Sequence, residues 1–307
     1  MGAVDVVVEN FRPGVTDRLG ISYADVRDRN PSIVYCSISG FGAHGELASM
    51  VALDGVAQAF AGALEASARD APFGSPFPVV FADLAAASTA ASGILAALLR
   101  RERTGRGCHI ELTLLDCLLP WLHAATINSM GPPITQVVTA SDGRSLLVQP
   151  ALPHLHDRFL RLCASVPGLE PVAADARFST LENVKANGDA YTMLVHAGFL
   201  TKPLEEWLRL LGEAGVPASP VHTLDQALNH PVMRTSGTVV PMEVPPGGTY
   251  HVVASPFHFD GSRRTPQTGP PHLGEHTAQV LRELLNTSDA ELSRLRNAGV
   301  IPASSPD

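Results

Sequence analysis

Short apolar runs alternate with amphipathic segments along the first third of the chain. The run Val4–Val8, which the loop ENFRPG ends, predicts a strand that is buried on both faces. Thr16–Leu19 and Tyr23–Arg29 have the pattern of short helices, and Pro31 ends the second of them. Ser32–Ser37 predicts a second buried strand. This strand, helix, strand order is typical of a parallel sheet.

The alternation continues beyond the second predicted strand. A helical pattern runs through Val56–Leu64, and Val79–Phe81 predicts a third strand. His109–Leu114 predicts a further strand, and Asp116 is expected to cap the helix that follows it.

The segment between Asp83 and Gly105 predicts one long helix. Its apolar and small residues recur with helical spacing from Leu84 to Leu99. An aspartate at its start and arginines near its end complement the helix dipole, and Gly105 suits the C-terminal cap. Because the apolar stretch is shorter than a bilayer span and rich in Ala, Ser and Thr, we expect a buried helix and no membrane partner.

The composition changes after Trp121. A break at Gly131–Pro133 precedes a stretch of amphipathic helices and short strands, and a β-rich return at Thr238–Phe259 leads to a helix at His276–Leu285. We therefore predict an α/β protein with a Rossmann-like parallel-sheet large domain and an inserted small α+β domain. The expected segments are 1–130 for the first part of the large domain, 131–230 for the small domain, and 231–307 for the return to the large domain.

Composition and charge narrow the class of protein. With 307 residues, 45% apolar and 17% charged, the chain is globular rather than disordered or fibrous. Its net charge of −8 argues against a nucleic-acid partner. The start MGAVDVVVENFRPG is no signal peptide, and the four cysteines form no CxxC pair. We expect free thiols, no metal site and a cytoplasmic location.

Two sequence patterns invite a functional interpretation on their own. Gly40–Gly45 is a literal GxGxxG after a predicted strand, and Glu65 follows about twenty residues later, as in a dinucleotide site. The pattern is weak, because the next residues do not clearly open a helix.

His154 and His156 are spaced i, i+2 and cannot share a helix face. We expect them to be surface or capping residues.

Asp83 is the most suggestive acid. It follows a predicted strand and opens a helix, so its carboxylate would lie at the carboxyl edge of the sheet, where such folds bind ligands. Helix N–H groups favour the anion by about 0.3–1 kcal/mol and would keep it ionised as a nucleophile. From the residues alone, a plain N-cap is the favoured alternative.

Five segments in order along the chain resemble the class III coenzyme A transferases. They are ENFRPGV at 9–15, NPSIVYCSISGFG at 30–42, FADL through RERTGRG to LTLLD at 81–116, AGVPASPV at 214–221 and HLGEHTAQVL at 272–281. This CaiB/BaiF-type superfamily includes formyl-CoA transferase, carnitine CoA-transferase and α-methylacyl-CoA racemase.

The resemblance implies a reaction, a site and an assembly. In these transferases an aspartate that matches Asp83 attacks an acyl-CoA and forms an aspartyl-CoA intermediate, which hands CoA to a carboxylic acid. CoA is thus a substrate, and no tightly bound cofactor is expected. The family resemblance also implies an interlocked homodimer. The residues expected to contact CoA are Asn10, Phe11, Arg12, Ser39, Gly40, Phe41 and Gly42.

Departures from the family pattern leave alternatives. The racemases have a histidine before an aspartate where this chain has Leu53 before Asp54, which makes racemisation the lesser alternative, because leucine cannot move a proton. Family members begin with a further βα segment, and the stretch between Trp121 and Thr139 is short here. The main alternative is therefore a truncated, partner-dependent or catalytically inactive member of the family.

Overall fold

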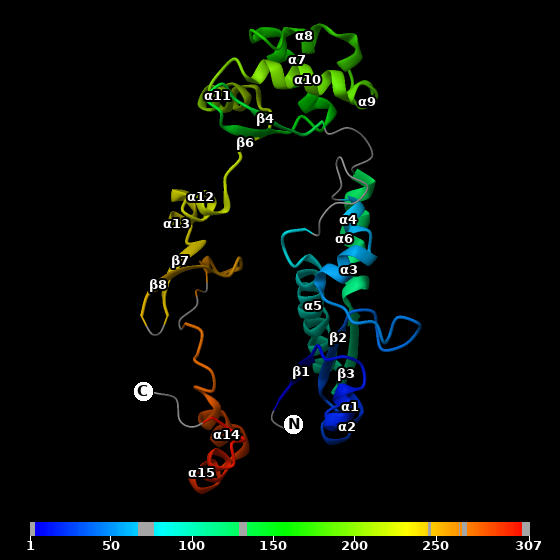
Figure 1. Cartoon of the computed structure of the whole chain (residues 1–307), viewed down its shortest axis with the longest axis vertical. Helices are drawn as coiled ribbons and strands as arrows, with labels where there is room; N and C mark the ends of the chain where they lie inside the picture. The colour runs from blue at the N-terminus through cyan, green and yellow to red at the C-terminus, as the bar shows by residue number, and fades with distance from the viewer. Residues whose placement is uncertain are drawn as a thin grey trace. The chain divides into compact units, whose positions relative to one another are not determined.

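The computed structural model describes residues 4–66, 77–128, 134–244, 247–263, 265 and 269–302. The chain divides into two compact units, Met1–Gly131 and Pro132–Asp307, which are described separately below. The predicted break at Gly131–Pro133 lies outside the described residues. Figure 1 gives the element labels that are used from here on.

The first unit is built on a three-stranded parallel sheet. Its strands are β1 (Val6–Glu9), β2 (Val34–Ser39) and β3 (Cys108–Thr113), in the order β1-β2-β3. β2 is the central strand and begins fully buried, which explains its unbroken apolar run. The predicted burial of the first strand on both faces is wrong, because β1 is an edge strand of this three-stranded sheet and Val8 is 54% exposed. The predicted mixed α/β class with a parallel sheet is confirmed.

The helices of this unit fill the two connections and follow the last strand. α1 and α2 connect β1 to β2, and α3, α4 and α5 connect β2 to β3. α5 packs against β2, β3 and α6. The helices span Val15–Leu19 (α1), Tyr23–Arg29 (α2), Asp54–Phe60 (α3), Ala63–Ala66 (α4), Phe81–Thr104 (α5) and Leu114–Asn128 (α6).

The predicted strand at Val79–Phe81 is wrong. Val79 lies in a bend and Val80 is the N-cap position of α5; both are more than half exposed, and Phe81 is the first residue of the helix. The Phe81 amide donates to the Val79 carbonyl at 2.7 Å, which turns the chain into the helix. A β-branched pair next to a turn therefore gave a false strand signal.

The cap predicted for Asp116 is also wrong. α6 begins at Leu114, and the Thr113 hydroxyl accepts the Asp116 amide at 2.8 Å. Asp116 is an acidic residue of the first turn, where its charge still favours the helix dipole.

α5 has two different faces. Its small residues Ala82, Ala85, Ala86, Ala90 and Ala97 are buried. Its larger residues Leu84, Leu95 and Leu99 are 53%, 67% and 58% exposed in this chain, so the predicted buried helix is wrong for that face. By length and composition alone α5 could cross a membrane, a test that core helices of soluble proteins also pass. Gly105 at its C-cap has φ 69°, as predicted for that position.

The second unit begins with an antiparallel sheet packed against helices. Strands β4 (Gln136–Thr139), β5 (Ser145–Val148) and β6 (Ala218–Pro220) are neighbours in that order. Their core is the largest in the described chain and includes Trp207, Phe199 and Tyr191. The helices are α7 (Pro153–Ser165), α8 (Glu170–Ala174), α9 (Leu181–Ala186), α10 (Gly188–Phe199) and α11 (Leu204–Ala214), with a 3₁₀ turn at Ala176–Phe178.

His156 on α7 does not lie at the surface as predicted. It is buried, and its Nε2 donates to the Phe178 carbonyl at 2.7 Å. Because a carbonyl can only accept, Nε2 carries the proton. His154 is exposed, as expected.

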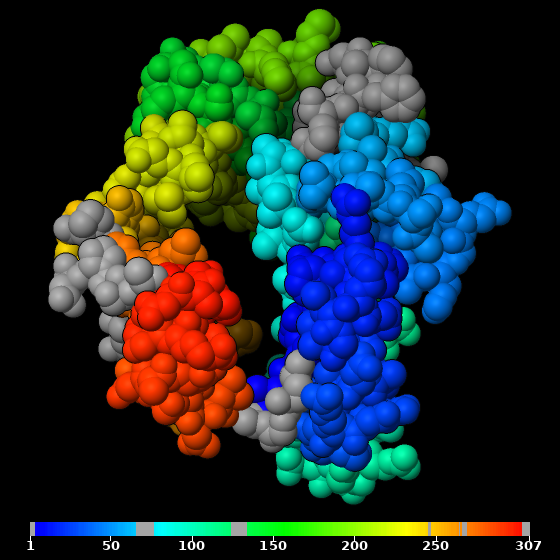
Figure 2. Space-filling view, turned by 60° about the horizontal axis from the view of Figure 1, so that its bottom comes forward, coloured from blue at the N-terminus to red at the C-terminus, as the bar shows by residue number. Residues whose placement is uncertain are grey.

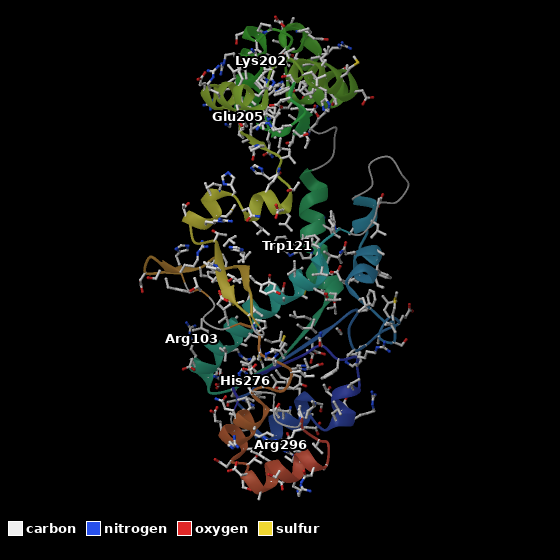
Figure 3. The ribbon with its side chains drawn as sticks, turned by 60° about the vertical axis from the view of Figure 1, so that its left-hand side comes forward. Arg103, Trp121, Lys202, Glu205, His276 and Arg296 are labelled. Carbon is white, nitrogen blue, oxygen red and sulfur yellow. The ribbon has the colours of Figure 1, made fainter. Side chains whose placement is uncertain are left out.

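Ion pairs fix the loop after β4 to α11. Asp142 accepts from the Arg144 guanidinium at 2.9 Å and from the Leu204 amide at 3.2 Å, and Arg144 also reaches Glu205 at 3.1 Å. Figure 3 labels Glu205 and Lys202 in this region. Such exposed pairs order the loop more than they stabilise the fold.

The remaining elements follow β6. Two helices, two hairpins and two further helices succeed one another, and the described strands among them pair only within their own hairpins. Their bounds are Leu224–Leu228 (α12), Pro231–Thr235 (α13), Val239–Glu243 (β7), Thr249–Val253 (β8), His258–Phe259 (β9), Ser262–Arg263 (β10), Thr277–Leu285 (α14) and Asp289–Asn297 (α15). The three-segment division at 130 and 230 stays a prediction.

Two helical glycines of this unit make a matched stability test. A Cβ on Gly198 would collide with the Leu169 side chain, whereas a Cβ on Gly212 meets nothing within 4 Å. We expect Gly198→Ala to lower the free energy of unfolding by about 1–3 kcal/mol through overpacking. Gly212→Ala should raise it by about 0.5–1 kcal/mol through helix propensity. Urea unfolding followed by circular dichroism measures both, and equal effects of the two variants would contradict this packing.

Candidate functional site

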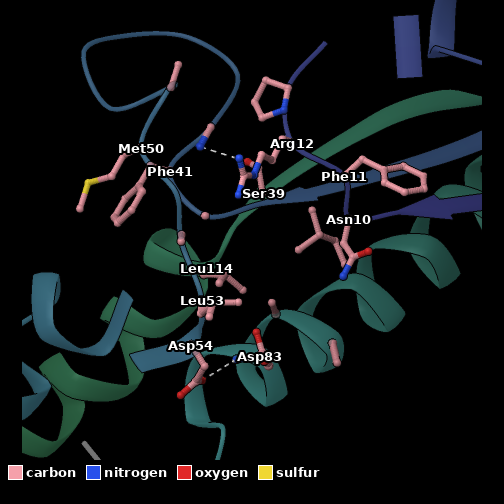
Figure 4. Close-up of a pocket in the computed structure, with 18 residues that line it drawn as sticks. Asn10, Phe11, Arg12, Ser39, Phe41, Met50, Leu53, Asp54, Asp83 and Leu114 are labelled. Atoms are coloured by element: carbon pink, nitrogen blue, oxygen red, sulfur yellow. Dashed lines mark hydrogen bonds between the residues drawn. The ribbon is translucent and has the colours of Figure 1, made fainter. Parts of the chain in front are cut away.

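A pocket of about 490 Å³ lies at the carboxyl edge of the parallel sheet of the first unit. Its walls come from the segments after β1 and β2, the residue after β3, and the first turns of α5 (Figure 4). This is the edge at which open α/β sheets bind ligands, because the connections there diverge and leave a crevice.

Every residue predicted for the site lines this one pocket. The loop after β1 supplies three of them, the end of β2 and its turn supply four, and α5 supplies the acid. The residues are Asn10, Phe11 and Arg12; Ser39, Gly40, Phe41 and Gly42; and Asp83. The fold thus brings together residues that are more than 70 positions apart, while their roles as CoA contacts and nucleophile stay predictions.

The turn after β2 is built for close packing. The Ser39 hydroxyl accepts the Gly42 amide at 3.0 Å, and Gly42 has φ 96°, which only glycine adopts readily (Figure 4). A Cβ on Gly40 would collide with the Ala52 side chain. Beyond this turn, residues 41–50 form a loop that projects from the surface of the first unit (Figure 2).

The GxGxxG interpretation finds no support in this geometry. Residues 43–49 form bends and turns and residues 50–53 have no regular structure, so no helix begins where the pyrophosphate of a dinucleotide would need one. Glu65 lies in the four-residue helix α4 and does not line the pocket. The glycines serve the turn and the close approach of Ala52 instead.

Asp83 is the third residue of α5 and not its N-cap. Its side chain is exposed on the pocket wall. The pKa of its carboxyl is raised above the ordinary value, first by the protein that surrounds the group and second by the nearby Asp54 carboxylate. The predicted stabilisation of the Asp83 anion by helix N–H groups is wrong, because the pKa of Asp83 is raised and the amides of Ala82 and Asp83 donate to another carboxylate.

That carboxylate belongs to Asp54, the first residue of α3. Its Oδ1 accepts the amides of Ala82 at 2.7 Å and Asp83 at 3.1 Å. The buried Gln58 donates its Nε2 to Asp54 Oδ2 at 2.6 Å. Sequence reasoning missed this pair. The available signal was the Asp54, Gln58 spacing of i, i+4 on a short helix, which places both polar groups on one face.

The pocket combines a few charges with an apolar lining. Asp83 and Asp54 are its acids, and Arg12 is the cation among the described lining residues. Phe41, Met50, Leu53 and Leu114 contribute apolar side chains (Figure 4). This arrangement places carboxylate groups and one guanidinium on the walls of the same cavity. A carboxylate is chemically able to act as a nucleophile, and a guanidinium is able to pair with a phosphate.

The four cysteines do not line the pocket. Cys36, Cys117 and Cys163 are buried free thiols, and Cys108 is partly buried. Burial raises the pKa of Cys163 to about 12, which makes it an inert thiol. Over the described parts of the chain, no group of three or more His, Cys, Asp or Glu residues could hold a metal ion.

Comparison with known sequences gives consistent matches. The sequence model of CoA-transferase family III matches residues 1–277. The chain is 34% identical to acetyl-CoA:oxalate CoA-transferase of Acetobacter aceti over 77% of this chain and 65% of that enzyme. It is 28% identical to an acyl-CoA transferase of Fusarium pseudograminearum, with 97% of this chain and 67% of that protein covered. The chain thus spans about two thirds of the length of these relatives.

Solved structures are also similar to this chain in sequence and fold. Rv3272 of Mycobacterium tuberculosis matches with a TM-score of 0.77 and 25% identity, over 89% of this chain and 76% of that one. A CAIB/BAIF family protein of Brucella suis matches with a TM-score of 0.75 and 29% identity, over 92% of this chain and 76% of that one.

Proposed function

The chain belongs to CoA-transferase family III and is an enzyme of that class, and on this premise we propose that it moves coenzyme A from an acyl-CoA donor to a carboxylic acid through an aspartyl-CoA intermediate on Asp83. One observation carries the proposal. Asp83 lies on the wall of the pocket that the segments after β1 and β2 also line. A thioester bound along those segments would therefore meet a carboxylate nucleophile.

The proposed reaction balances without a further reagent. The Asp83 carboxylate attacks the thioester carbonyl, the C–S bond breaks, and a mixed anhydride and CoA thiolate form. The thiolate then attacks the Asp83 carbonyl of the anhydride, which releases the donor acid and leaves aspartyl-CoA. The acceptor carboxylate and the same thiolate repeat these steps in reverse. Each intermediate is as reactive as the thioester, so transfer needs no metal, redox group or tightly bound cofactor.

The raised pKa of Asp83 fits the nucleophilic role. A more basic carboxylate is a better nucleophile, provided that it is ionised at the working pH. The role as a nucleophile also predicts how the transfer rate changes with pH. The rate should fall as the pH drops through the pKa of Asp83, because the protonated acid cannot attack.

Several finer features belong to the same proposal. We infer that the segment 131–230 is a small domain inserted into the parallel-sheet domain, that 231–307 returns to the latter, and that the protein acts in the cytoplasm as an interlocked homodimer. The family resemblance supports the dimer, and the exposed leucines of α5 are compatible with it. Sedimentation of the purified chain tests the dimer, and a monomer would contradict it.

Racemisation is not favoured. The relatives named above are transferases, and the residue before Asp54 is Leu53, whose side chain has no acid or base group that could move a proton.

A partner-dependent chain remains the competing proposal. A thioester-exchange screen of the purified chain, with a panel of CoA esters and free acids, separates the two: exchange by the chain alone supports the transferase, and none contradicts an autonomous enzyme.

Arg12 gives a binding test of the same pocket. It is exposed in the loop after β1 and lines the pocket. We propose that its guanidinium pairs with a CoA phosphate. We expect Arg12→Ala to raise the dissociation constant for CoA about 10- to 100-fold, the usual cost of one charged hydrogen bond. Calorimetry measures this, and Arg18→Ala on α1, outside the pocket lining, is the matched control. Equal affinities of the two variants would remove Arg12 from the site.

A further inference from the structure

The N-terminus of α5 is capped by a side chain from a different helix. The N-cap position, Val80, has no side chain that can accept a hydrogen bond. Asp54 on α3 takes its place, because one carboxylate oxygen accepts the amides of both Ala82 and Asp83 (Figure 4). Free amides at a helix start must find an acceptor, so this contact fixes where α5 begins.

The Asp54 carboxylate is itself held in place. Gln58 is fully buried and donates to Asp54 Oδ2 at 2.6 Å and to the Val79 carbonyl at 3.3 Å. Its Oε1 accepts the Phe77 amide at 2.8 Å. Gln58 thereby ties α3 to the turn that leads into α5 at two further points. A buried polar group with all its partners is a rigid link.

We propose that Asp54 is a positioning residue: together with Gln58 it holds the backbone of Asp83, so that the Asp83 carboxylate faces the pocket and none of the helix amides binds it. The role as a positioning residue for catalysis rests on the proposed function. The geometry itself does not, since it consists of contacts within the chain.

The contact has two consequences for Asp83. The Ala82 and Asp83 amides donate to Asp54 and are not available to the Asp83 anion. The pKa of Asp83 is raised first by burial and second by the nearby Asp54 charge. The charged groups that face Asp83 across the described pocket are Asp54 on α3 and Arg12 in the loop after β1. Removing the Asp54 charge should therefore lower the pKa of Asp83.

Two variants separate the cap from the charge. Asp54→Asn keeps an oxygen that can accept the amides but loses the charge, whereas Asp54→Ala loses both. Asp116→Asn is the matched control, because Asp116 is also an aspartate in the first turn of a helix but is exposed and does not line the pocket. Should the alanine variant fail to fold, the asparagine variant still decides the effect of the charge.

Three measurements test the proposal. Hydrogen exchange should show the Ala82 and Asp83 amides about 5- to 30-fold less protected in Asp54→Ala, the usual effect of a lost cap. Labelling of Asp83 by a water-soluble carbodiimide, followed by mass spectrometry across pH, should have its midpoint at lower pH in Asp54→Asn than in the wild type. In the transfer assay, the acidic limb of kcat should move to lower pH in Asp54→Asn, and kcat should fall more than KM rises in Asp54→Ala.

The outcomes distinguish this proposal from the proposed function. Unchanged amide protection in Asp54→Ala and an unchanged labelling midpoint in Asp54→Asn would overturn the positioning role. Both of these measurements need no substrate. A wild-type chain that labels as expected but transfers no CoA would instead contradict the proposed function and leave the contact between Asp54 and the helix established.

Discussion

Asp83→Ala should reduce CoA transfer by at least about a thousandfold, since the variant removes the nucleophile and with it the covalent route. The side chain is exposed on the pocket wall and accepts none of the hydrogen bonds described at the start of α5. The fold should therefore survive the change. Transfer kinetics with saturating donor and acceptor, together with circular dichroism, measure the two effects separately.

Asp83→Asn provides the chemical control. Its side chain has nearly the same shape but cannot form an anhydride or a thioester with CoA, so no CoA adduct should be trapped on it. Mass spectrometry of the protein incubated with an acyl-CoA detects the adduct in the wild type. Retained transfer in either variant, or a trapped adduct on the asparagine variant, would refute the assignment of Asp83.

Trp207→Ala should cost about 3–5 kcal/mol of the stability of the second unit. Trp207 is fully buried, its ring centre lies 4.3 Å from that of Phe199, and its Nε1 donates to the Phe199 carbonyl at 2.8 Å. Truncation would leave a cavity and an unpaired carbonyl in the largest core of the described chain. Hydrogen exchange of the β4, β5 and β6 amides reports this unit without interference from the first.

Trp121→Ala is the natural control, because it removes the same side chain from an exposed position. Trp121 lies on α6 of the first unit and is 56% exposed (Figure 3). Its replacement should leave the exchange of the β4, β5 and β6 amides unchanged. A cost below about 1 kcal/mol for Trp207→Ala would contradict the packing of this core.

The pocket itself was largely predictable from local patterns and the family resemblance. Apolar strands that alternate with helices predict a parallel sheet, a parallel sheet predicts a binding edge, and the loops that carry the family resemblance supply its residues. The wrong predictions share one cause: the sequence does not show which acceptor each backbone amide meets. This applies to the false strand at Val79–Phe81, to the cap assigned to Asp116 and to the expected stabilisation of the Asp83 anion. His156 was misplaced for the same reason, since its partner, the Phe178 carbonyl, lies 22 residues away.

The sequence by itself determined the alternation of strands and helices and the long α5 with its glycine end, because these follow from periodicity and chain direction. The family resemblance supplied the set of residues that meet at the sheet edge. Only the tertiary structure decided that Asp54, 29 residues before Asp83, accepts the helix amides, and that burial first and the Asp54 charge second raise the pKa of Asp83. A helix amide donates to whichever oxygen the fold brings to it, and chain position alone does not specify that oxygen.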